Sequence, residues 1–125
     1  MRLLLDTHIA IWLTSDAVEL TAAARKLITE ADEVFVSSAA IWEASTKVAL
    51  GKLPLLPQRF ADQLRLAGIE PLPVTWAHAL AAHNLPVLHK DPFDRLLVAQ
   101  AMSEPMHLLT HDAALTAYSD LVIVV

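Results

Sequence analysis

Four short apolar runs limit the fold of this chain more than any other feature of its sequence. They lie at residues 3–5, 34–36, 107–110 and 121–125. Their apolar residues are consecutive rather than alternating, which is typical of strands that are buried on both faces. Such strands occur in parallel sheets that helices cover on both sides. A further short strand is predicted within residues 69–74.

Helical patterns fill the sequence between these runs. Thr21 is suited to an N-cap, and Gly51 and Gly68 are suited to helix C-termini. The predicted helices cover residues 7–13, 21–31, 37–50, 57–68, 75–83 and 92–103. Helices that alternate with buried strands predict an α/β fold with a mainly parallel sheet. No repeat, low-complexity stretch or linker divides residues 1–125, so we expect a single domain.

The composition excludes several classes of site. The chain has no cysteine, which excludes disulfides, zinc–thiolate sites, iron–sulfur clusters and cysteine nucleophiles. Its two glycines are too few for a phosphate-binding P-loop or a dinucleotide fingerprint. A net charge of −5 argues against a protein whose whole surface binds nucleic acid. Any metal in this chain must therefore bind to oxygen or imidazole.

Apolar residues make up 55% of the chain, but no run approaches the roughly 18 residues that a membrane span needs. Asp6 interrupts the apolar start of the chain, so a signal peptide is not expected. We expect a cytoplasmic protein without a membrane segment. The apolar excess also favours a surface that is buried against a partner.

Acidic residues follow the predicted strands, where ligands of parallel sheets bind. Asp6 comes directly after the first strand and Asp112 shortly after the third apolar run, while Glu43 lies in the second turn of the helix that starts near residue 37. Each acid has a simple alternative role, because Asp6 and Asp112 could cap helices and Glu43 could pair with Lys47 at the surface. Together they indicate one acidic cluster at this edge of the sheet.

The stretch "HKDPFDRLLVAQAM" at residues 89–102 adds two more acids. Asp91 precedes Pro92, so we expect Asp91 to be mainly the N-cap of a helix. Asp94 shares a helical stripe with Leu97, Val98 and Ala101, which should face the core. A solvated acid does not belong on that stripe, but an acid at its N-terminal tip can point at the edge of the sheet. We therefore assign Asp94 to the acidic cluster.

Converging carboxylates repel one another unless a cation neutralises them. Oxygen ligands without cysteine favour Mg²⁺ or Mn²⁺ over zinc. Such ions activate water and stabilise the leaving oxygen in phosphodiester hydrolysis. The residues thus favour a metal-dependent enzyme that acts on a phosphodiester.

The motifs that carry these acids resemble those of the PIN-domain family, and in particular its VapC-type ribonuclease toxins of toxin–antitoxin pairs. They are "LLLDTHIAIWL", "VSSAAIWEASTKVALGKL", "HKDPFDRLLVAQA" and "LLTHD", in this order along most of the chain. The resemblance implies a three-layer α/β/α sandwich, Mg²⁺- or Mn²⁺-dependent endoribonuclease activity, an antitoxin partner and a homodimer. It places the catalytic, metal-binding acids at Asp6, Glu43, Asp94 and Asp112, with Thr110 in support.

Other residues near this site have less specific roles. Lys47, Lys52, Lys90 and Arg95 could contact RNA phosphates, and Arg95 is favoured because it neighbours Asp94. His8 is interpreted mainly as a packing or capping residue, with a contact to RNA as the alternative. The tryptophans are expected in the core or an interface, with RNA stacking as a lesser role; they are Trp12, Trp42 and Trp76.

Two other classes of function fit parts of the sequence. A phospho-accepting receiver domain also has a parallel sheet and an acidic pocket, but Asp6 stands alone after the first strand and no lysine follows the last one. A non-catalytic PIN-like module that binds RNA or a protein is the stronger alternative. Metal-dependent cleavage of mixed RNA would separate that module from an enzyme.

Overall fold

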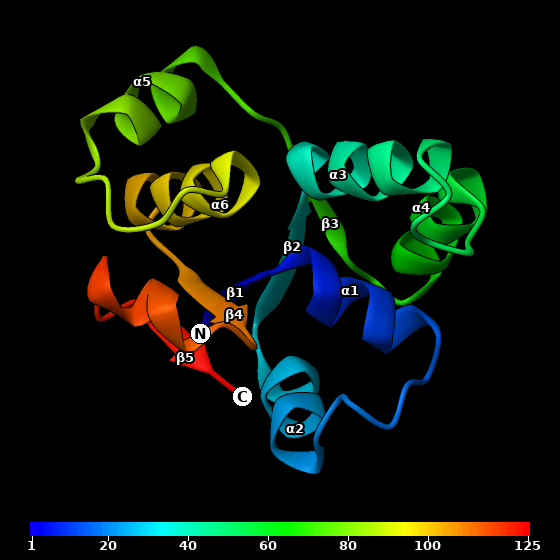
Figure 1. The fold of residues 1–125 in the computed structure, drawn as a ribbon. Coiled ribbons are helices and arrows are strands. Elements are labelled where there is room, and N and C mark those ends of the chain that lie inside the picture. The colour runs from blue at the N-terminus through cyan, green and yellow to red at the C-terminus, as the bar shows by residue number, and fades with distance from the viewer.

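The computed structural model describes all 125 residues, and a five-stranded sheet forms its centre (Figure 1). The strand order is β3-β2-β1-β4-β5, and every neighbouring pair is parallel. The strands are β1 (Arg2–Leu5), β2 (Glu33–Ser37), β3 (Glu70–Leu72), β4 (His107–Thr110) and β5 (Val122–Val124). The predicted α/β class is therefore correct, and the sheet is entirely rather than mainly parallel.

Helices cover both faces of this sheet, which makes the fold a three-layer α/β/α sandwich. Figure 1 shows α5 and α6 on one side and α1 and α4 on the other. The helices are α1 (Thr7–Thr14), α2 (Ala22–Glu30), α3 (Ser38–Ala49), α4 (Pro57–Leu66), α5 (Trp76–Asn84) and α6 (Pro92–Ser103), with a 3-10 turn η1 (Ala113–Ala117). None of the helices is long and apolar enough to span a membrane.

The consecutive apolar residues of β1 pack into two separate hydrophobic cores, one on each face of the sheet. Leu3 and Leu5 pack with residues of α1, α3 and α4, whereas Leu4 packs with Leu97 and Val98 of α6 on the opposite face. All three leucines are fully buried. The central strand therefore needs apolar side chains in both directions, which explains why its sequence does not alternate.

Local signals fix the ends of several elements. The Thr21 side chain accepts a hydrogen bond from the backbone N–H of Ala24 at 3.1 Å, as its predicted N-cap role requires. Gly51 and Gly68 follow α3 and α4 with φ angles of 72° and 79°, a left-handed conformation that costs glycine little. Pro71 lies in β3, which is an edge strand and tolerates a residue without an N–H.

Two tryptophans do not join the core. Trp42 is 66% exposed and Trp76 is 90% exposed, whereas Trp12 is partly buried against the first core. Of the two predicted positions, the core is therefore wrong for Trp42 and Trp76, and an interface remains a prediction. Trp42 packs edge-on against Phe93, with ring centroids 5.3 Å apart.

Candidate metal and active site

Asp6 lies where the central strand β1 ends. Its backbone N–H donates to the Leu109 carbonyl at 2.9 Å, which continues the pairing of β1 with β4. Its Oδ2 accepts a hydrogen bond from Thr110 Oγ1 at 2.6 Å, while its buried Oδ1 has no hydrogen-bond partner. Burial raises the pKa of this carboxyl group. Asp6 occupies the N-cap position of α1, but its side chain accepts no capping hydrogen bond. The alternative role of Asp6 as a helix cap is therefore wrong.

Glu43 comes from the second turn of α3 and is only 3% exposed. Thr7 Oγ1 donates to its Oε1 at 2.6 Å, and Lys47 Nζ donates to its Oε2 at 2.8 Å. The expected pair of Glu43 with Lys47 is therefore present, but it is not a surface pair. Two donors hold the carboxylate in one orientation beside Asp6.

The two aspartates at the start of α6 differ in their contacts. Asp91 Oδ1 accepts hydrogen bonds from the backbone N–H groups of Phe93 at 2.8 Å and Asp94 at 3.2 Å, which is the predicted cap. The Asp94 side chain is 16% exposed. Its burial, followed by the charges of Asp6, Asp91 and Glu43, raises its pKa to about 7. The ionised form of Asp94 is therefore disfavoured in the folded protein, by burial first and by the neighbouring charges second.

Asp112 follows β4 and uses its two carboxylate oxygens differently. Oδ1 accepts a hydrogen bond from the Ala114 N–H at 3.0 Å and caps η1, whereas Oδ2 lies 3.0 Å from His89 Nε2. The hydrogen bond with His89 lowers the pKa of this carboxyl group. The backbone N–H of Asp112 also donates to Thr110 Oγ1 at 3.1 Å. Thr110 therefore connects Asp6 to Asp112 from beneath the site, where it is fully buried.

All four expected acids line one open cleft of about 390 Å³. Asp91 lines it as well, so a capping residue also faces the site. Apart from Trp12, the lining is polar or charged; its members are Asp6, His8, Trp12, Glu43, Lys47, Asp91, Asp94, His111 and Asp112. Asp6 and Asp112 follow β1 and β4, and Glu43 and Asp94 lie on α3 and α6.

Arg95 does not face this cleft. Its guanidinium donates to the carbonyl groups of Ala82 and Pro86 at 2.9 Å and to Tyr118 Oη at 3.2 Å. Its predicted contact with RNA phosphate is therefore corrected to a structural role, because these groups occupy its donors. Lys47 lines the cleft, whereas Lys52 and Lys90 do not.

His89 is a site residue that the sequence did not reveal. Its Nε2 lies 3.0 Å from Asp112 Oδ2 and 3.6 Å from Asp94 Oδ2. The only sequence signal was its place two residues before Asp91. The 85–91 segment has no regular secondary structure, so no helical or strand period could orient this ring.

The residues fit a hard divalent cation. Asp6 Oδ1 is a buried carboxylate oxygen without a partner, and such an oxygen is costly unless a cation or donor reaches it. Repulsion among the acids raises the pKa of Asp94 further. Carboxylate oxygens are the ligands that Mg²⁺ and Mn²⁺ prefer. The cluster therefore has the composition of a site for a divalent cation.

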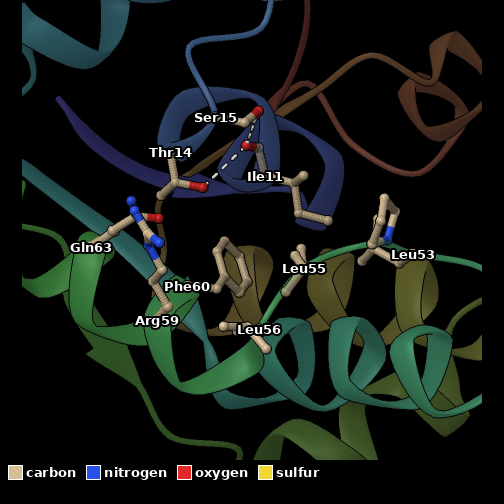
Figure 2. A pocket seen from close by; sticks show the side chains of 10 residues that line it. Ile11, Thr14, Ser15, Leu53, Leu55, Leu56, Arg59, Phe60 and Gln63 are labelled. Atoms are coloured by element: carbon tan, nitrogen blue, oxygen red, sulfur yellow. Dashed lines mark hydrogen bonds between the residues drawn. The ribbon is translucent and has the colours of Figure 1, made fainter.

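A larger groove of about 560 Å³ lies away from the acids, between α1, the 53–56 segment and α4 (Figure 2). Phe60 lies in its centre, with Leu55 and Leu56 on one side and Arg59 and Gln63 on another. The groove contains no carboxylate. It is therefore suited to binding an apolar group and not to metal chemistry.

Comparisons with known proteins agree with the fold. The family model of the PIN domain matches residues 3–121. The chain belongs to the PIN-domain family. It is 32% identical over 121 residues to ribonuclease VapC22 of Mycobacterium tuberculosis, a match that covers 92% of this chain and 90% of that protein.

Solved structures of similar fold include two toxin–antitoxin complexes. One is VapBC2 of Rickettsia felis bound to a DNA fragment from its promoter, with a TM-score of 0.72, 16% identity, and 100% of this chain and 98% of that chain covered. The other is a toxin–antitoxin complex from Klebsiella pneumoniae, with a TM-score of 0.68, 20% identity, and 96% and 94% covered. At these identities the likeness establishes the fold.

Proposed function

We propose that this chain is a metal-dependent endoribonuclease of the VapC type, which hydrolyses RNA phosphodiester bonds as the toxin of a toxin–antitoxin pair. The observation that carries the proposal is the convergence of four acids on one cleft, where Asp6 Oδ1 is buried without a partner. The 32% identity to ribonuclease VapC22, over nearly the full length of both chains, supports the same activity.

In this proposal Asp6, Glu43, Asp94 and Asp112 hold Mg²⁺ or Mn²⁺. The bound ion supplies an activated water and stabilises the charge that develops on the phosphate. Thr110 orients Asp6 and Thr7 orients Glu43, each through a hydrogen bond of 2.6 Å. Lys47 adds a positive charge to the cleft wall, where a phosphate of the bound RNA would lie.

The proposal includes a cognate antitoxin and a homodimer. The two solved structures described above are toxin–antitoxin complexes. The groove in Figure 2 offers an apolar surface to which a peptide could bind outside the acidic cleft. The exposed side chains of Trp42 and Trp76 support a further apolar interface. Light scattering should give a dimer at micromolar concentration. If the protein were a monomer both alone and when mixed with the product of a neighbouring small gene, the homodimer and the antitoxin complex would both be contradicted.

The test of activity compares cleavage of a mixed RNA pool by the wild type, Asp6→Asn and Asp120→Asn in Mn²⁺, Mg²⁺ and excess EDTA. Asp120 is exposed and does not line the cleft, so Asp120→Asn is the matched control. We expect cleavage by the wild type and the control only with a divalent ion, and none by Asp6→Asn. RNA binding without cleavage under all conditions would favour a non-catalytic PIN-like module. If Asp6→Asn cleaved RNA as fast as the wild type, Asp6 would not be a residue of the active site.

A further inference from the structure

His89 lies between two acids that come from different elements. Its Nε2 is 3.0 Å from Asp112 Oδ2 and 3.6 Å from Asp94 Oδ2. The three ligand atoms lie within 4.8 Å of one another. By distance alone the ring is either a third metal ligand or a hydrogen-bond donor that orients a carboxylate.

The second ring nitrogen decides between these roles. The backbone N–H of Asp91 donates to His89 Nδ1 at 3.1 Å. Nδ1 is therefore an acceptor, so the proton of the neutral ring is on Nε2. A protonated Nε2 donates to Asp112 and has no lone pair for a metal. The geometry thus favours a donor that acts through Asp112.

The backbone of His89 is itself fixed by a distant side chain. Tyr118 Oη accepts hydrogen bonds from the N–H groups of His89 at 2.9 Å and Leu88 at 3.2 Å. Arg95 donates to the same oxygen at 3.2 Å and to the Pro86 carbonyl at 2.9 Å. Tyr118 and Arg95 therefore fix the backbone of the irregular 85–91 segment, which gives the ring a defined place.

We propose that His89 is a positioning residue of the metal site, which orients the Asp112 carboxylate through its Nε2–H. Asp112 needs such a contact because its side chain is 41% exposed and its only other side-chain hydrogen bond caps η1. Tyr118 acts on the same contact by fixing the segment that carries His89. This inference deepens the proposed function and depends on it for the identity of the site.

Two amide variants separate the functions of the two ring nitrogens. His89→Gln places an N–H donor where Nε2 lies, whereas His89→Asn keeps an acceptor for the Asp91 N–H but does not reach Asp112. Mn²⁺ affinity is measured by calorimetry without RNA, and melting curves check that each variant folds. We expect His89→Asn to bind Mn²⁺ about tenfold more weakly, as for other residues that orient metal ligands. His89→Gln should remain within about threefold of the wild type.

Two results would overturn the proposal. Wild-type Mn²⁺ affinity of folded His89→Asn would show that the donor is not needed. A loss in His89→Gln as large as that in His89→Asn would make the ring itself a ligand. The assay contains no RNA, so a protein that binds Mn²⁺ as expected but cleaves no RNA would refute the proposed function and not the role of His89.

Tyr118→Phe tests the contact between His89 and Asp112 through the backbone that carries His89. It removes the hydroxyl oxygen that holds the 88–89 backbone, and we expect a smaller loss of Mn²⁺ affinity, about threefold. Combined with His89→Asn it should add nothing further, because both changes act on one contact. Additive losses in the double variant, or wild-type affinity of Tyr118→Phe, would show that Tyr118 does not act through His89.

Discussion

Replacing Asp94 by asparagine should stabilise the metal-free protein while it abolishes metal binding. The wild-type carboxylate is 16% exposed and lies near the charges of Asp6, Asp91 and Glu43. Burial and these charges penalise its ionised form in the folded state. The amide that Asp94→Asn introduces has nearly the same shape as the carboxylate and carries no charge, so that penalty disappears.

The sign and size of the effect follow from the pKa. The pKa of Asp94 rises from its usual 3.8 to about 7 on folding, so the folded protein holds this proton more tightly than the unfolded chain. Its contribution to stability is therefore complete below pH 3.8 and is lost as the pH rises through 7. A tenfold change in acid constant is worth about 1.4 kcal/mol, which sets an upper limit of about 4 kcal/mol at pH 8. Solvent screening of the partly exposed group reduces this, and we expect about 2 kcal/mol.

The assay is urea unfolding in EDTA at pH 5 and pH 8, with Asp120→Asn as the exposed control. We expect Asp94→Asn to exceed the wild type by about 2 kcal/mol at pH 8 and by less at pH 5. Adding Mn²⁺ should stabilise the wild type and not the variant, because only the wild type binds the ion. If Asp94→Asn were less stable than the wild type at pH 8 in EDTA, the argument from burial and carboxylate repulsion would be refuted.

Two further predictions concern the supporting residues. Asp91→Ser keeps a capping oxygen, so it should change the free energy of unfolding by less than about 0.5 kcal/mol and leave substantial RNA cleavage, whereas Asp91→Ala should cost about 1 kcal/mol. If Asp91→Ser cleaved RNA as poorly as Asp94→Asn, Asp91 would belong to the metal site. Thr110→Val removes the hydroxyl that donates to Asp6 and accepts from the Asp112 N–H. It should therefore lower the free energy of unfolding in urea by about 1–3 kcal/mol and weaken Mn²⁺ binding. An unchanged unfolding midpoint would contradict the role of Thr110.

The main elements were predictable because each has a local signal. The apolar runs locate four strands, and the stripe of Leu97 and Val98 orients α6 correctly towards the sheet. The rule for parallel sheets then brings Asp6 and Asp112 to one edge. Asp94 and Glu43 follow from the faces of their helices. These residues could be grouped before any coordinates were known.

Contacts between distant segments were not predictable in this way. His89 owes its place to Tyr118, which lies 29 residues later in the sequence. Arg95 neighbours an acid of the cleft, yet its side chain turns to the carbonyl groups before α6. Neither contact has a period or motif in the sequence, because each depends on how irregular segments meet in space.

The hydrogen bond between Thr110 and Asp6 joins residues that are 104 positions apart. β4, which carries Thr110, comes after β1, β2 and β3 in the sequence, although it lies beside β1 in the sheet. A growing chain can therefore present Asp6, Glu43 and Asp94 well before it can assemble the cleft. The cleft can be completed only after β4 and Asp112 have been made, so the order of synthesis delays its assembly until all four acids are present.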